Sequence, residues 1–180
     1  PREASANNEL FYPLQYFSQA QQNATQADSL YTLALEGAEG KYGLLDIVDE
    51  YSGTKAANLA RYAAGISYMN LNQYQEAISY LEDFKTDDAM LGPISLGNIG
   101  DAFMQLGQAG DALGYYERAL AEDANDFTTP LYLQKAGVTA LELGETQKAL
   151  EFFTRIKEEY PNSSQANGVD AFIGMAQTGN

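Results

Sequence analysis

The chain has 180 residues, a size at which one domain can bury a hydrophobic core without disulfides or metals. It carries 25 Asp and Glu against 10 Lys and Arg, and its net charge of −15 repels phosphate backbones and anionic lipid headgroups. We therefore expect no nucleic acid partner and no direct binding to a membrane surface. The absence of Cys and His excludes zinc sites, thiol nucleophiles and His-dependent triads, and we expect no metal, no cofactor and no catalytic residue.

The N-terminal third has a helical pattern. We expect a long helical stretch over about residues 4–36, with a break near residues 23–25. Residues 47–54 resemble residues 156–163, and both segments look like the end of one helical repeat and the loop into the next. Residues 4–57 are therefore expected to hold N-terminal helices and a degenerate repeat.

Glycine and alanine recur together through the rest of the chain. Three pairs share a spacing of 12 residues: Gly65 with Ala77, Gly100 with Ala112, and Gly137 with Ala149. Seven residues after each glycine comes Asn72, Gly107 or Gly144, residues suited to a left-handed helix C-cap. The spacing predicts two antiparallel helices per repeat, with the glycine where a neighbour's backbone comes close and only a small side chain fits, and the alanine facing it. Each helix pair leaves an apolar face open, so the pairs must stack.

These positions resemble the tetratricopeptide repeat (TPR). The three copies match its small and apolar positions as follows: Gly65, Tyr68, Ala77 and Leu81; Gly100, Phe103, Ala112 and Tyr116; Gly137, Ala140, Ala149, Phe153 and Pro161. The resemblance implies an all-α fold, an α–α superhelix or TPR-like solenoid, with repeats at residues 58–91, 93–126 and 130–163. We expect the whole of residues 1–180 to form a single domain that ends in a capping helix at residues 164–176. Val169, Phe172, Ile173 and Ala176 would form its apolar stripe.

In TPR solenoids, certain positions of the first helix of each repeat line a concave groove. The corresponding residues here are Leu59, Tyr62, Ile66, Met69, Ile94, Gly97 with its neighbour Asn98, Asp101, Met104, Leu131, Gln134, Val138 and Leu141. Some TPR grooves grip a terminal carboxylate with basic side chains, but only Asn98 and Lys135 lie near this one. We therefore expect the groove to take an apolar segment or an amphipathic helix. The alternative is that the chain's own N-terminal helix fills it.

Paired carboxylates at Asp87-Asp88, Glu122-Asp123 and Glu158-Glu159 could serve acid–base catalysis, but no partner residue converges on them, and we expect them to be solvated surface.

The predicted function is noncatalytic: a protein–protein interaction scaffold or chaperone-like adaptor. A cytoplasmic or outer-membrane-assembly adaptor and a self-assembling structural module, for example a homodimer, are the alternatives.

A narrower resemblance covers the whole chain. Asp28-Ser29, residues 34–37 and residues 43–47, leading into residues 51–60, are similar to bacterial TPR proteins of the YfgM type. In that group an N-terminal membrane helix holds the repeats on the periplasmic side of the inner membrane, and enterobacterial members are partners of the Sec translocon. The resemblance implies an envelope location, with the Sec translocon or envelope clients as partners. It also implies that an anchor preceded Pro1 and that Arg2-Glu3-Ala4 follows its end.

Overall fold

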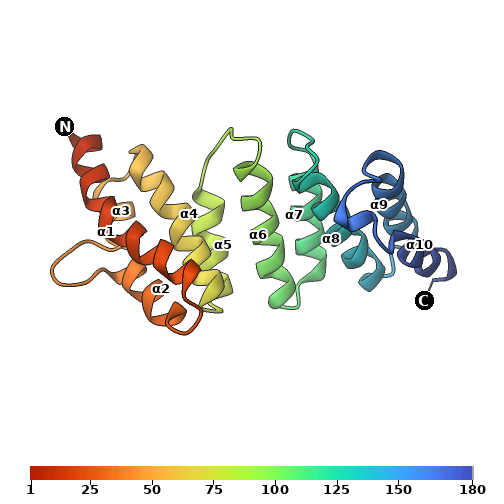
Figure 1. Cartoon of the computed structure of the whole chain (residues 1–180), viewed down its shortest axis with the longest axis horizontal. Helices are drawn as coiled ribbons and strands as arrows, with labels where there is room; N and C mark the ends of the chain where they lie inside the picture. The colour runs from red at the N-terminus through yellow and green to blue at the C-terminus, as the bar shows by residue number, and fades with distance from the viewer. Residues whose placement is uncertain (180) are drawn as a thin grey trace. The chain divides into compact units, whose positions relative to one another are not determined.

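The computed structural model describes residues 1–179, and in this part of the chain it contains ten α-helices, one short 3₁₀ helix and no strand (Figure 1). The helices are α1 (Arg2–Gln22), α2 (Ala27–Glu36), α3 (Leu44–Glu50), α4 (Lys55–Asn70), α5 (Tyr74–Asp83), α6 (Leu91–Gln105), α7 (Ala109–Leu120), α8 (Thr128–Glu142), α9 (Thr146–Glu159), the 3₁₀ helix η1 (Ser164–Ala166) and α10 (Val169–Thr178). The all-α prediction is confirmed, and the break in the N-terminal helical stretch falls between α1 and α2, as expected.

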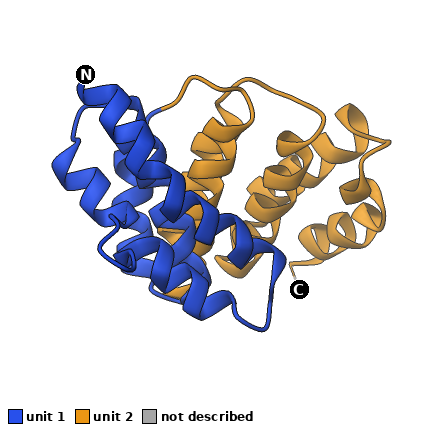
Figure 2. Cartoon of the chain, turned by 60° about the vertical axis from the view of Figure 1, so that its left-hand side comes forward, with its two compact units in different colours: residues 1–85 blue, residues 86–180 orange. Residues whose placement is uncertain are grey.

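The helices group into two compact units. Unit 1 comprises Pro1–Lys85 and unit 2 comprises Thr86–Asn180 (Figure 2). Unit 1 holds α1 to α5 and unit 2 holds α6 to α10. The three predicted repeats correspond to the helix pairs α4–α5, α6–α7 and α8–α9. That residues 1–180 behave as a single domain stays a prediction.

Each of the three helix pairs turns through the same C-cap. Asn72, Gly107 and Gly144 have φ angles of 59°, 72° and 74°, the left-handed conformation that the sequence predicted. The N–H of the residue after each of them bonds to a carbonyl five residues earlier, for example Gln108 to Phe103 at 2.9 Å. The cap residue itself bonds three residues back, for example Gly107 to Met104 at 3.0 Å. This Schellman pattern pairs the last carbonyls of the helix and reverses the chain at the same place in every repeat.

The repeat glycines make room for large side chains of the partner helix. A Cβ atom at Gly100 would lie 2.6 Å from Cε1 of Tyr116, and one at Gly137 would lie 2.6 Å from Cε1 of Phe153. At Gly65 the nearest atom is Cγ of Leu81, at 2.5 Å. The expectation that a neighbour's backbone comes closest to each glycine is therefore wrong, because the nearest atoms at all three belong to side chains. The residue that meets each glycine comes one helical turn after the alanine, and its long side chain reaches across the helix pair.

The C-terminal capping helix begins later than the sequence suggested. Ser163 caps a turn, accepting a 3.2 Å hydrogen bond from the N–H of Ala166, but this turn is only the 3₁₀ helix η1. Gly168 then takes a left-handed φ of 78°, which interrupts the helical path, so α10 starts at Val169 and not at residue 164. The apolar stripe is as predicted, because Phe172 stacks on Phe153 at a ring distance of 5.0 Å.

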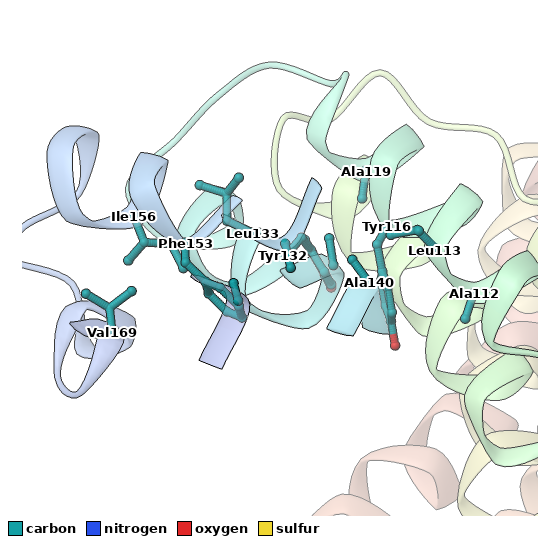
Figure 3. Packing of buried hydrophobic residues seen from close by; sticks show 13 residues of the cluster. Ala112, Leu113, Tyr116, Ala119, Tyr132, Leu133, Ala140, Phe153, Ile156 and Val169 are labelled. Carbon is teal, nitrogen blue, oxygen red and sulfur yellow. The ribbon is translucent and has the colours of Figure 1, made fainter. Parts of the chain in front are cut away.

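Each unit has its own core. In unit 1, Ala6 and Leu10 of α1 pack with Ala56, Ala60 and other buried residues of α4. The start of α1 is fixed to the start of α4, because the Glu3 carboxylate accepts hydrogen bonds from the first two N–H groups of α4 at 3.0 and 3.1 Å. Figure 3 shows the core of unit 2, in which buried side chains follow one another from α7 to α10: Leu113, Tyr116, Tyr132, Leu133, Phe153, Ile156 and Val169.

Candidate functional site

Unit 2 contains a hollow on the first helices of its two repeats, with a volume of about 240 Å³. Its lining is Asp101 and Met104 of α6, Tyr116 of α7, and Gln134, Lys135, Val138 and Thr139 of α8. We name this hollow the α6–α8 groove. The structure thus brings together Asp101, Met104, Gln134 and Val138 from the candidate set that the sequence supplied.

Asp101 organises the floor of the α6–α8 groove. Nζ of Lys135 lies 2.7 Å from each of its two carboxylate oxygens, and the hydroxyl of Tyr116 donates a 2.6 Å hydrogen bond to Oδ1. The Lys135 and Asp101 side chains are 34% and 29% exposed, so the pair is partly shielded from water. Because both charges are matched within the groove, its floor offers a partner no unpaired charge.

Burial is the main cause that raises the pKa of Tyr116 far above its usual value, and the hydrogen bond to Asp101 raises it further. The phenol therefore stays protonated and keeps its role as a donor. Its ring lies 6.2 Å from the Tyr132 ring in a stacked arrangement (Figure 3). A Cβ atom at Gly97 would collide with the Tyr132 ring, so Gly97 is buried beneath that ring.

The apolar part of the α6–α8 groove consists of Met104 and Val138. Val138 is 40% exposed, although it is mid-helical and aliphatic. Met104 is half-buried and packs against the core of unit 2, and Oγ1 of Thr139 lies 3.7 Å from its sulfur. Val138 is thus the apolar side chain most available to a partner, whereas Met104 also supports the fold.

The remaining candidates of unit 2 lie outside the lining of this hollow. Leu131 and Leu141 are half-buried and pack against the core of unit 2. Ile94 and Asn98 on α6 are half-buried. All four lie on α6 or α8, the first helices of the two repeats, and that they contact a partner stays a prediction.

The unit 1 candidates lie on α4. Leu59 is exposed, and Tyr62, Ile66 and Met69 are half-buried. The ring of Tyr62 packs against Phe84 at 5.1 Å, on the segment that leaves α5. The neighbouring Asn58 exchanges hydrogen bonds of 2.7 and 3.0 Å with the backbone of Lys85, which holds that segment in place.

The N-terminal helix α1 contacts α4, and Ala6 and Leu10 of α1 share the core of unit 1 with Ala56, Ala60 and Ala63 of α4. Tyr62, Ile66 and Met69 belong to the face adjacent to these alanines on the same helix. These three groove candidates are not among the residues of the unit 1 core.

The network under the groove was missing from the sequence-based site. Lys135 and Asp101 have opposite charges and are 34 residues apart, which is close to one repeat, and this spacing is the signal that could have joined them.

The three carboxylate pairs that the sequence offered as candidates for catalysis are exposed, as expected. Within residues 1–179, no three His, Cys, Asp or Glu side chains are arranged to hold a metal ion. No helix in this range combines the length and the apolar character that a membrane span needs.

Comparisons with known proteins agree with this architecture. The crystal structure of MamA protein superimposes with a TM-score of 0.65 at 18% sequence identity, covering 96% of this chain and 83% of that one. The crystal structure of nearly identical TPR-like repeats, from a Podosopora anserina protein named as a kinesin light chain, superimposes with a TM-score of 0.63 at 15% identity and covers 100% and 88%. At these identities the similarity concerns the fold.

Sequence comparison identifies the family. No curated protein is similar to the chain at the level of sequence. The family model of the tetratricopeptide repeat matches residues 62–127 and 98–164, which together cover more than half of the chain. This range includes the three Schellman turns and the three glycines that receive a large side chain from the next helix. The chain belongs to the tetratricopeptide repeat family.

Proposed function

We propose that the chain is a noncatalytic scaffold that binds an apolar or amphipathic segment of a protein partner in the α6–α8 groove. Tetratricopeptide repeats are in general scaffolds that bind proteins, and this chain has the repeat architecture. The observation that carries the proposal is the exposure of Val138 beside Met104, at a hollow whose charged groups are already paired with each other. A partner's apolar side chain can cover Val138 without leaving a buried charge unpaired.

The size of the hollow favours a peptide side chain over a small molecule. Its volume of about 240 Å³ lies below the roughly 300–1,000 Å³ of pockets that enclose drug-sized ligands. Such a hollow takes one anchoring side chain, while the flanking surface of α6 and α8 contacts the rest of the segment.

A carboxylate-clamp mode of binding fits this groove poorly. A clamp needs a cation that is free to meet the terminal carboxylate of the partner. Lys135 already contacts both oxygens of Asp101, and a second carboxylate would have to compete with that pair. We therefore place the specificity of the groove in its apolar contacts.

A photo-crosslinking amino acid at position 138 tests the proposal. Gly114 on α7 is the matched control, because it is exposed and a Cβ atom there meets nothing within 4 Å. In cells, position 138 should give a discrete adduct with a protein partner, and position 114 should not. Equal adducts at both positions would contradict a groove-specific function, and an adduct between two copies of the chain would favour self-assembly.

We also propose that the chain works in the bacterial envelope, on the periplasmic side of the inner membrane, with the Sec translocon or envelope clients as partners. The support is the resemblance of residues 28–60 to YfgM-type proteins. Protease accessibility in intact cells and in spheroplasts tests the location. We expect the protease to digest the chain only after the outer membrane is opened. Protection of the chain in spheroplasts would favour the cytoplasmic adaptor.

A further inference from the structure

Two loops of unit 2 share one construction. Oδ1 of Asp88 accepts hydrogen bonds from the N–H groups of Met90 and Leu91, at 2.9 and 2.8 Å. One repeat later, Oδ1 of Asn125 accepts from the N–H of Phe127 and of the residue after it, at 2.9 and 2.7 Å. In both loops the side-chain oxygen accepts from the N–H of the residue directly before the helix and from the first N–H of the helix itself, α6 or α8. Met90 and Phe127 are therefore held at equivalent positions, each directly before its helix.

The two loops also touch. Nδ2 of Asn125 lies 3.4 Å from the carbonyl oxygen of Ala89, and the carboxylate of Glu122 lies beside Gly92. Figure 2 shows both loops at the same end of unit 2. Residues 86–92 and 121–128 thus form one surface, which we name the capped rim.

The capped rim presents apolar side chains that the fold leaves uncovered. Phe127 is 76% exposed, more than any other large apolar residue that the structure describes, and Met90 is 38% exposed. The turns need only the backbone N–H groups of these two residues, so any side chain would satisfy them. An aromatic ring and a thioether held out in water by fixed turns are typical of a contact surface for a partner.

The charge of the capped rim is of one sign. It carries five exposed carboxylates and no Lys or Arg: Asp87, Asp88, Glu122, Asp123 and Asp126. The backbone N–H groups of Leu91 and Met90 lower the pKa of Asp88, which keeps that carboxylate ionised. A partner that covers Phe127 must therefore approach through a negative field, which favours positive charge on the partner.

We infer that the capped rim is a second docking surface, distinct from the α6–α8 groove, for a basic segment of a protein partner. An apolar side chain of that segment packs on Phe127 and Met90, and its Lys or Arg side chains face the carboxylates of the rim. Nucleic acids and anionic membranes are unsuitable partners, because their phosphates meet the same negative field.

Fluorescence anisotropy with two labelled peptides of equal length tests the inference. The peptides share their Leu and Phe residues and differ in having Lys or Glu at every other position. The Lys peptide should bind the purified chain, more weakly as salt rises, and the Glu peptide should not bind. Phe127→Ser should weaken binding of the Lys peptide about fivefold or more, and so should the double variant Asp123→Asn with Asp126→Asn.

The control variants make the same chemical changes elsewhere in unit 2. Met175→Ser removes another exposed apolar side chain, and Asp111→Asn with Glu142→Gln removes two other exposed charges. These variants should bind the Lys peptide as the native chain does. Equal weakening by the two charge variants would overturn the proposal, because it would show attraction to the acidic protein as a whole.

Two other outcomes would also overturn it. If Val138→Arg abolishes binding of the Lys peptide and Phe127→Ser leaves it unchanged, the peptide sits in the α6–α8 groove, and the groove function stands while the rim proposal fails. If the Glu peptide binds as well as the Lys peptide, the charge of the rim does not select the partner. Matching circular dichroism melting curves for all variants ensure that binding changes come from the surface.

Discussion

The hydroxyl of Tyr116 and the carboxylate of Asp101 form a 2.6 Å hydrogen bond that joins α7 to α6 beneath the α6–α8 groove. Asp101 in turn binds Lys135 on α8, so one carboxylate links three helices from two repeats. The groove floor is therefore a fixed, charge-matched platform. This leaves the exposed apolar side chain of Val138 as the feature that a partner can use.

Tyr116→Phe isolates the hydrogen bond under the groove. The ring stays in its buried place against Gly100, but Asp101 loses a donor. Because a hydrogen bond to a charged group contributes about 1.5–3 kcal/mol, and Lys135 still pairs with Asp101, we expect a loss of about 1–2 kcal/mol in the free energy of unfolding. Urea denaturation measures it, and an unchanged midpoint would show that the bond does not contribute to stability.

The contribution of Tyr116 to the free energy of unfolding should depend on pH. The pKa of Tyr116 is raised in the folded state, so its contribution to stability is complete below the unfolded pKa of about 10 and is lost as the pH rises above that value. The difference in unfolding free energy between the native chain and Tyr116→Phe should be constant from neutral pH to about pH 9 and should shrink at higher pH. A difference that grows above pH 10 would reverse the sign and contradict the assigned cause.

Alanine substitutions at two helical glycines, Gly100 and Gly114, should have opposite effects on stability. Gly100→Ala places a Cβ atom 2.6 Å from the Tyr116 ring and should destabilise unit 2 by about 1–3 kcal/mol through overpacking. Gly114→Ala on α7 meets nothing within 4 Å and should stabilise the helix by about 0.5–1 kcal/mol. Thermal unfolding of the two variants should shift the midpoint in opposite directions. A stabilised Gly100→Ala variant would show that the Tyr116 ring is free to move away.

Asn125 predicts a stability effect at the capped rim. Asn125→Ala removes the acceptor for two N–H groups and the donor to Thr128 and Ala89, and should cost about 1–2 kcal/mol. Asn125→Asp keeps the acceptor, as Asp88 does in the previous repeat, and should lose less. Chemical denaturation separates the two variants, and an equal loss would place the stabilising contribution in the donor alone.

The local features of the fold were predictable, because short spacings encode them. The left-handed caps at Asn72, Gly107 and Gly144 depend on residue type and on position relative to the repeat glycine. That a side chain, Tyr116, and not backbone comes closest to Gly100 was not predicted, because it depends on the direction of a side chain one turn beyond Ala112 on α7.

The candidate site was predictable only in part. The register of the first helices placed Asp101, Met104, Gln134 and Val138 on one surface, and they do line one hollow. The ion pair between Lys135 and Asp101 depends on the rotation of α8 against α6, which periodicity does not specify. The exposure of Phe127 depends on how Asn125 turns the chain, a property of side-chain hydrogen bonding that hydropathy does not reveal.

The most direct test of the groove function is the affinity for the partner segment recovered by crosslinking at position 138. Isothermal titration should compare the native chain, Val138→Arg and the control Gly114→Arg, all with matching melting temperatures. A long charged side chain in the groove leaves its charge unpaired against an apolar segment, so Val138→Arg should weaken binding about tenfold or more, equivalent to about 1.4 kcal/mol. Gly114→Arg should bind as the native chain does. Equal affinity of all three proteins would contradict the assignment of the α6–α8 groove as the binding site.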